Sequence, residues 1–273
     1  MTWALVALLL TVNAPPSLSA YANRVRGVDT ARLGAALEAA GLALPPEIEI
    51  TLIEDEDPRA GSIPSWIVGF AFGERDIVIF PDRVLSYPYD SLESVVRHEI
   101  THLALNVRAA GQSLPRWFHE GVAVSVDRGW NTEAQLRLLI AMMARPDIAE
   151  LTRLFASPSQ SETQQAYLLS ALLVADLRRR HGAGFPGAVV SRVASGMPFD
   201  RAFRLTAHES PDAAAAAAWA GYRRWTAWVP AITSGSAAWG FIVILALLAF
   251  AVQRRRRALR RRAWDEPDDP FAG

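Results

Sequence analysis

Polar and apolar residues alternate most clearly in the first third of the chain. Between Glu47 and Ile53 the apolar residues recur at every second position, which is the period of a half-buried strand. Two further extended runs, Trp66 to Phe72 and Asp76 to Phe80, flank the turn-forming segment Gly73-Glu74-Arg75. These two runs therefore predict a β-hairpin.

After Phe80 the spacing of apolar residues changes to that of a helix. Asp90 is placed to cap this helix, with Glu93 reaching back as in a capping box. Five apolar residues then share one stripe at helical spacing: Leu92, Val95, Val96, Leu103 and Val107. Further helices are expected at about 115–127, 132–144, 162–180, 198–206 and 212–224. A small N-terminal sheet followed by a mainly helical region predicts an α+β fold.

The N-terminal segment is typical of a secretory signal. An apolar run from Trp3 to Val12 is followed by prolines and small residues up to Ala20-Tyr21-Ala22. This order predicts a signal peptide at residues 1–22, cleaved after Ala22. The run is short for a bilayer span, but it lacks the usual preceding positive charge, so an uncleaved anchor or a buried helix stays an alternative.

The C-terminal segment predicts a membrane anchor. No charged residue occurs from Trp225 to Gln253, and residues 231–252 are numerous enough to span a bilayer as a helix. Clusters of arginine follow at once, at 254–257 and 260–262. Such clusters stay in the cytoplasm, so we expect a cytoplasmic arginine-rich tail at 253–273 and an extracytoplasmic domain at 23–225. The linker from Trp225 to Pro230, before the predicted span, is short. We therefore expect the substrates of this domain to be membrane-proximal proteins or peptides.

Composition narrows the possible chemistry. The formal net charge is zero, so no basic excess indicates a nucleic-acid partner. Cysteine is absent, which excludes disulfides, thiolate catalysis and cysteine-ligated zinc. Any metal ion would have to be held by histidine and carboxylate side chains.

One short motif carries the candidate chemistry, His98-Glu99-Ile100-Thr101-His102. Residues four apart face the same way on a helix, so both imidazoles can reach one ion, with Glu99 beside them. A catalytic zinc site needs a third protein ligand and an open fourth position for water. The next predicted helix offers Glu120, and a turn at Gly111 would bring that helix back beside the first.

This pattern, followed by Trp-Phe-x-Glu-Gly-x-Ala at residues 117–123, resembles the gluzincin metallopeptidases, in particular the bacterial peptidase MA-like family. The resemblance is tight from His98 to Ala123 and weaker on either side. It implies a zincin-like catalytic region in a protein of the bacterial cell membrane, with Glu99 as general base. The implied ligands of the Zn²⁺ ion are His98, His102 and Glu120.

The chain also departs from that family. Many gluzincins carry, four residues after the third ligand, a carboxylate that orients a histidine, whereas this chain has Val124 there and Asp127 as the substitute candidate. Tyr167 is either the hydroxyl donor that stabilises the oxyanion, as in similar enzymes, or a core tyrosine whose hydroxyl reaches the surface. His119 is expected to be exposed.

The sequence therefore predicts a membrane-anchored zinc metallopeptidase that hydrolyses peptide bonds with zinc-activated water. The strand from Trp66 to Phe72 would pair with an extended peptide substrate. Two alternatives stay open: a catalytically inactive, membrane-anchored binding or scaffold protein, and a structural zinc site closed by His119. No motif for a substrate's amino terminus is present, which favours an endopeptidase.

Overall fold

The computed structural model describes residues 8–84, 91–127 and 146–226. Compactness divides the chain into residues 1–220 and 221–273, and all elements below lie in the first unit except the end of the last helix. The predicted helix at 132–144, the predicted membrane span at 231–252 and the predicted tail at 253–273 lie outside the described residues. Within the described ranges, none of the helices has the length and apolarity needed to cross a membrane.

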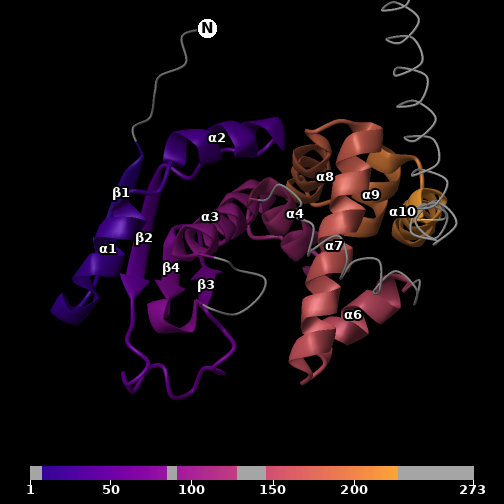
Figure 1. The fold of residues 1–273 in the computed structure, drawn as a ribbon. Helices are drawn as coiled ribbons and strands as arrows, with labels where there is room; N and C mark the ends of the chain where they lie inside the picture. The colour runs from indigo at the N-terminus through magenta and orange to yellow at the C-terminus, as the bar shows by residue number, and fades with distance from the viewer. Residues whose placement is uncertain (1–7, 85–90, 128–145, 227–273) are drawn as a thin grey trace, which may run out of the picture. The chain divides into compact units, whose positions relative to one another are not determined.

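The fold is mixed α+β, mostly helical with one small sheet, as predicted at that level (Figure 1). The sheet has the order β1-β2-β4-β3, in which β1 and β4 run parallel to β2 while β3 runs antiparallel to β4. Its strands are β1 (Leu9–Asn13), β2 (Glu47–Leu52), β3 (Gly69–Phe72) and β4 (Asp76–Ile79). In this sheet β1 and β3 are the two edge strands.

The helices α1 and α3 pack against the sheet, and a second group of helices forms a separate layer on the far side of α3 (Figure 1). Two short 3₁₀ helices are η1 (Pro16–Leu18) and η2 (Pro81–Arg83). The α-helices are α1 (Ser19–Arg26), α2 (Thr30–Ala39), α3 (Leu92–Ala109), α4 (Arg116–Asp127), α6 (Ile148–Ala156), α7 (Gln160–His181), α8 (Phe185–Ala194), α9 (Phe199–Ala207) and α10 (Pro211–Thr226). Because α3 contacts β3, β4, α1, α4 and α8, it joins the sheet to the helical layer.

The strands follow the predicted period. The alternate residues Ile48, Ile50 and Leu52 of β2 are fully buried, which confirms the half-buried strand. The predicted hairpin is also present, and Gly73 in its turn has a φ of 61°, a left-handed value that favours glycine. β3 begins at Gly69, so it is shorter than predicted and Trp66 precedes it in a turn.

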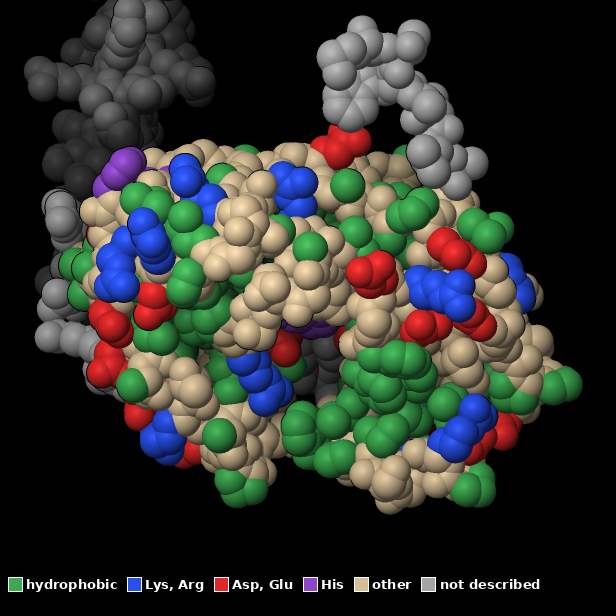
Figure 2. All heavy atoms as spheres, turned by 180° about the vertical axis from the view of Figure 1, so that it is seen from behind, with side chains coloured by type: hydrophobic (Ala, Val, Ile, Leu, Met, Phe, Trp, Pro, Cys, Tyr) green, Lys and Arg blue, Asp and Glu red, His purple; other side chains and the backbone are tan. Residues whose placement is uncertain are grey.

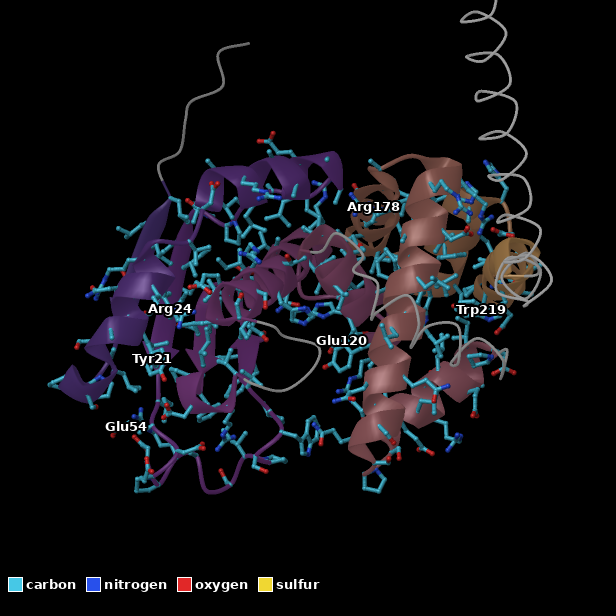
Figure 3. All side chains as sticks on the ribbon, viewed as in Figure 1. Tyr21, Arg24, Glu54, Glu120, Arg178 and Trp219 are labelled. Carbon is cyan, nitrogen blue, oxygen red and sulfur yellow. The ribbon has the colours of Figure 1, made fainter. Side chains whose placement is uncertain are left out.

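Within the predicted signal peptide, residues 8–22 belong to the described part of the chain and form β1, η1 and the start of α1. β1 pairs in register with β2, and Leu18 and Ala22 are buried in the core. The next turn of α1 is tied to α3, because the Arg24 guanidinium donates to both carboxylate oxygens of Glu93 at 2.9 and 3.0 Å (Figure 3). Cleavage after Ala22 stays a prediction, and it would remove β1 and half of α1.

The start of α3 differs from the predicted cap at Asp90, which lies outside the described residues. Ser91 is the N-cap: its hydroxyl accepts from the Ser94 amide at 3.2 Å, while the Ser94 hydroxyl accepts from the Ser91 amide at 3.3 Å. Ser94 rather than Glu93 is therefore the reciprocal partner of the cap, and the Glu93 carboxylate forms an ion pair with Arg24 of α1. The predicted apolar stripe is buried except at Val107, near the end of the helix, which is 38% exposed.

Close packing of α4 against α7 sets the position of the Trp-Phe-x-Glu-Gly-x-Ala segment at residues 117–123. Gly121 lies at the contact, where a Cβ atom would stand 2.5 Å from the Ser170 carbonyl oxygen and 2.7 Å from Val174 Cγ2. Only glycine allows two helices to approach this closely. The position of Glu120, one residue earlier, is therefore determined by the α4–α7 contact.

Candidate metal centre

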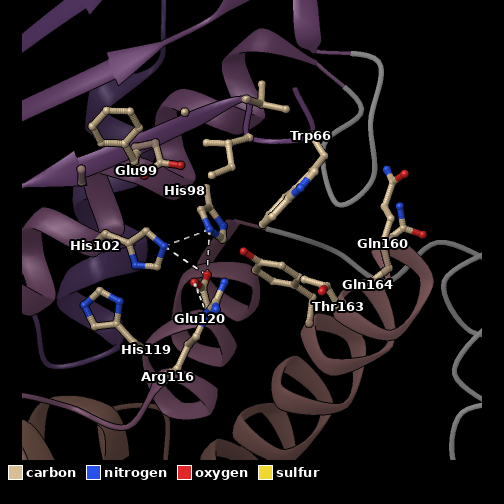
Figure 4. A pocket seen from close by; sticks show the side chains of 16 residues that line it. Trp66, His98, Glu99, His102, Arg116, His119, Glu120, Gln160, Thr163 and Gln164 are labelled. Carbon is tan, nitrogen blue, oxygen red and sulfur yellow. Dashed lines mark hydrogen bonds and ion pairs between the residues drawn. The ribbon is translucent and has the colours of Figure 1, made fainter. Parts of the chain in front are cut away.

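Three of the predicted site residues meet at the floor of one cavity (Figure 4). The Nε2 atoms of His98 and His102 lie 3.0 Å apart. A carboxylate oxygen of Glu120, Oε2, lies 3.3 Å from the first and 3.2 Å from the second. α3 supplies the two histidines at i and i+4, and α4, running back after the turn at Gly111, supplies the carboxylate.

The spacing of these atoms fits a metal ion. Ligand atoms about 2.0–2.1 Å from a tetrahedral zinc ion lie about 3.3 Å from one another. The three distances, 3.0 to 3.3 Å, are close to that value. The histidines are buried and the Glu120 side chain is 12% exposed, so a charge placed between them would be shielded from water. This buried group can therefore bind a metal ion.

The remaining described walls of the cavity come from α3 itself and from two other parts of the fold. Glu99, 2% exposed, lines it from α3 between the two histidines in sequence. Tyr167 and Thr163 line it from α7, and residues 66–71, up to and including the start of β3, form another wall. In Figure 2, the face opposite to that of Figure 1 is hollowed, and histidine and acidic side chains are visible in the hollow beside a group of hydrophobic side chains.

β3 presents a free edge at this cavity. It is the last strand of the sheet and pairs only with β4 among the strands of the described ranges. Trp66, which is 43% exposed, lies at the mouth opposite Gln160 and Gln164 of α7 (Figure 4). As far as the described residues go, the cavity thus has a strand edge without a paired neighbour on one side and amide side chains on the other.

The charges of the site act strongly on Glu120. Burial alone would raise the pKa of Glu120, but the adjacent His102 and His98 outweigh burial and hold this pKa well below its ordinary value. The carboxylate is therefore ionised and able to bind a cation. Its other oxygen, Oε1, lies 3.8 Å from the Arg116 guanidinium.

Tyr167 lies at the border between cavity and core. Its ring is 6.4 Å from the His98 ring and packs at 82° against Phe155, 5.4 Å away. Burial, together with the negative charge of Glu120, raises the pKa of Tyr167 far above its ordinary value. The phenol is thus a neutral hydroxyl in the cavity wall, able to donate a hydrogen bond.

The prediction that His119 is exposed is wrong. Its ring stacks on the ring of His102 at a centroid distance of 4.4 Å and an interplanar angle of 4°. Its Nε2 donates to Asn106 Oδ1 at 3.1 Å. Burial, aided by the neighbouring His102, lowers the pKa of His119 to about 3, so the ring is neutral. His119 does not belong to the donor group of three residues found among the described residues.

Two further expectations concern the orientation of the ligands. Val124, where a carboxylate was expected by resemblance, is buried and apolar. The side chain of the substitute candidate Asp127 lies outside the described residues. Within the described part of the chain, the buried His102 Nδ1 has no hydrogen-bond partner.

Sequence analysis missed two polar residues beside the site. Arg116 lines the cavity and donates to the Phe155 carbonyl at 3.0 Å, and Asn106 binds His119. A signal was available for both, since Arg116 precedes Glu120 by four residues and Asn106 follows His102 by four. Helical spacing places each residue on the same helix face as a ligand. It does not predict the partners of these residues, which lie on other helices.

Comparison with known proteins assigns no family to the chain. No protein-family model matches the chain, and a search of curated proteins finds no match.

Proposed function

We propose that this chain is a zinc-dependent peptidase, and the single observation that carries the proposal is the donor triangle of His98, His102 and Glu120. Its edges of 3.0 to 3.3 Å suit tetrahedral zinc, and two imidazoles with one carboxylate are a ligand set of catalytic zinc sites. Glu99 lines the same cavity, as the His-Glu-x-x-His pattern requires of a general base. The resemblance to gluzincins supports this reading.

The proposed mechanism divides the work among the residues of the cavity. When bound, zinc acidifies water and polarises a carbonyl group. The Glu99 carboxylate accepts the proton of the attacking water and passes it to the leaving amine as the peptide bond breaks. The Tyr167 hydroxyl, kept neutral by its surroundings, donates a hydrogen bond to the carbonyl oxygen as that oxygen gains negative charge.

β3 is the proposed docking edge for the substrate. An extended peptide that adds to the free edge would run along the cavity wall formed by residues 66–71. Main-chain hydrogen bonds would hold the peptide with little regard to sequence, and Trp66 at the mouth would contact one side chain. Side-chain replacements along this wall that leave peptide affinity and cleavage intact would count against this placement.

The metal site is tested first by zinc stoichiometry of the full chain in detergent, measured by elemental mass spectrometry. We expect about one zinc per chain in the parent protein and a large loss in Glu120→Ala, because removal of a ligand opens the site. A folded parent that takes up no zinc on reconstitution would refute the proposal.

Catalysis is tested separately with Glu99→Gln and a library of quenched fluorescent peptides. We expect Glu99→Gln to keep its zinc while cleavage falls by a factor on the order of 10² to 10⁴. Glu93→Gln, the same change six residues earlier on α3 and outside the cavity, is the matched control. A parent that binds zinc but cleaves nothing would instead favour the alternative, an inactive peptidase-like scaffold.

We also propose that the domain lies outside the cytoplasm of a bacterial cell, anchored by residues 231–252. The apolar run and the arginines after it support this placement. The proposed substrates are then membrane-proximal proteins or peptides. A chain ending before residue 231 that processes the natural substrate as well as the anchored chain would weaken this part of the proposal.

A further inference from the structure

Among the described residues, none supplies the usual restraint on the ring of His102, a proposed ligand. Histidines that bind metals almost always donate their second ring nitrogen to a carboxylate, a carbonyl or water, which fixes the ring orientation. The second nitrogen of His102, Nδ1, is buried and has no such partner among the described residues. Val124 occupies the position from which a carboxylate was expected.

A different contact takes up one face of this ring. The His119 imidazole lies parallel to that of His102, within 4° and with centroids 4.4 Å apart (Figure 4). A stacked neighbour at this distance blocks rotation of the His102 ring out of its plane, because rotation would drive ring atoms into the neighbour's face.

His119 is itself held by a chain of hydrogen bonds. Its Nε2 donates to Asn106 Oδ1 at 3.1 Å, and Asn106 Nδ2 donates to the carbonyl oxygen of Gly73 at 3.1 Å. Since Gly73 lies in the β3–β4 turn and Asn106 on α3, the ring of His119 is fixed relative to both. The sheet, the first ligand helix and the second ligand helix are thereby joined behind His102.

We propose that His119 is a positioning residue, which sets the ring plane of His102 by stacking in place of a hydrogen bond to Nδ1. Asn106 and the Gly73 carbonyl hold His119 for this role. The proposal rests on the metal site proposed above. It also excludes His119 as a fourth ligand, since its Nε2 proton is used by Asn106 and its ring lies flat on a ligand rather than pointing into the donor triangle.

The test compares metal binding by the full chain and by two variants, His119→Ala and His119→Phe. Zinc affinity is measured by competition with a chromophoric chelator, and ligand geometry by the visible absorption of the cobalt(II)-loaded protein. We expect His119→Ala to weaken zinc binding by about tenfold or more and to change the cobalt spectrum. His119→Phe keeps an aromatic face but loses the hydrogen bond to Asn106, so we expect it to be weakened no more than Asn106→Ala and clearly less than His119→Ala.

Three controls separate positioning from other effects. Unfolding midpoints of the metal-free proteins report any general loss of stability, which alone would not change the cobalt spectrum. His181→Ala removes a histidine that contacts an aromatic ring outside the cavity, Phe185 at 5.3 Å, and should leave zinc affinity unchanged. Asn106→Ala removes the anchor of His119 but no ring, and should weaken zinc binding less than His119→Ala.

Two results would overturn the positioning role. A folded His119→Ala with the zinc affinity and cobalt spectrum of the parent would show that the stack does not matter. A His119→Phe as impaired as His119→Ala, with Asn106→Ala near the parent, would show that His119 acts through a nitrogen atom rather than through its aromatic face, as a ligand would. A parent chain that binds neither metal would refute the metal site itself, and with it this proposal.

Discussion

Replacing Gly121 with alanine tests whether the α4–α7 contact determines the position of the third ligand. In an ordinary helix this change is favourable by about 1 kcal/mol, because alanine is the better helix former. At Gly121 the new Cβ would stand 2.5 Å from the Ser170 carbonyl oxygen, a backbone atom that no side-chain rotation can move away. The two helices must therefore separate.

The size of the effect follows from these distances. Carbon atoms in good contact lie about 3.5–4.0 Å apart, so α4 has to shift by about 1 Å. Overpacking of this kind costs about 1–3 kcal/mol, which exceeds the gain in helix propensity. We expect a net loss of up to about 2 kcal/mol of stability in the metal-free protein. Because ligand distances tolerate only about 0.2 Å, displacement of Glu120 should also weaken zinc binding at least tenfold.

The assay pairs chemical unfolding of the metal-free protein with the chelator competition described above. Gly34→Ala is the matched control, because Gly34 lies within α2 and its new Cβ would meet only Leu44 Cδ2, at 3.9 Å. It should stabilise the protein by about 0.5–1 kcal/mol and leave zinc affinity unchanged. If Gly121→Ala proves as stable as Gly34→Ala and binds zinc like the parent, the reasoning is refuted.

Three other predictions follow from contacts described above. Starting the chain at Asn23 should lower the unfolding midpoint strongly, because β1 and the buried residues Leu18 and Ala22 are lost. Mass spectrometry of the mature N-terminus will show whether cells cleave the chain after Ala22. Arg24→Ala should cost about 0.5 kcal/mol at neutral pH. Since Arg24 lowers the pKa of Glu93, the pair stabilises the fold above about pH 4 and this difference should vanish in acid unfolding titrations. Tyr167→Phe should lower kcat for peptide cleavage while zinc stoichiometry stays the same, and an unchanged kcat would exclude the hydroxyl from the mechanism.

The elements that sequence analysis predicted are those encoded locally. The alternation in β2, the glycine turn of the hairpin and the i, i+4 histidines of α3 depend only on neighbours in the chain. Glu120 could be placed near the histidines because its helix follows after a short turn. The proposed ligand set therefore needed little tertiary information.

The elements that sequence analysis missed depend on distant partners. β1 was not predicted, because its apolar run followed by small residues fits a signal peptide and its place in the sheet depends on pairing with β2, far along the chain; the signal peptide itself stays a prediction. α8 was not among the predicted helices, and it contains Pro186 and Gly187. In the structure the proline occupies the first turn of the helix, and a Cβ on Gly187 would stand 2.1 Å from the Gly41 carbonyl oxygen.

The surroundings of the proposed ligands likewise could not be predicted from local patterns in the sequence. The stack of His119 on His102 joins two helices whose crossing is set by Gly121 and α7, and no periodicity in α4 encodes it. For the same reason Tyr167 could be assigned to either cavity or core. It lies at the border of both, with its ring against Phe155 and its side chain in the cavity wall.

The place of β1 at the edge of the sheet has a consequence for solubility. β1 covers the backbone groups of β2, and a chain cut after Ala22 would expose them as a new edge with Ile48 and Ile50 along one face. Unprotected edges of this kind pair with strands of other molecules. In the same detergent, such a chain should therefore self-associate, with light scattering that rises with protein concentration, while the intact chain stays dispersed.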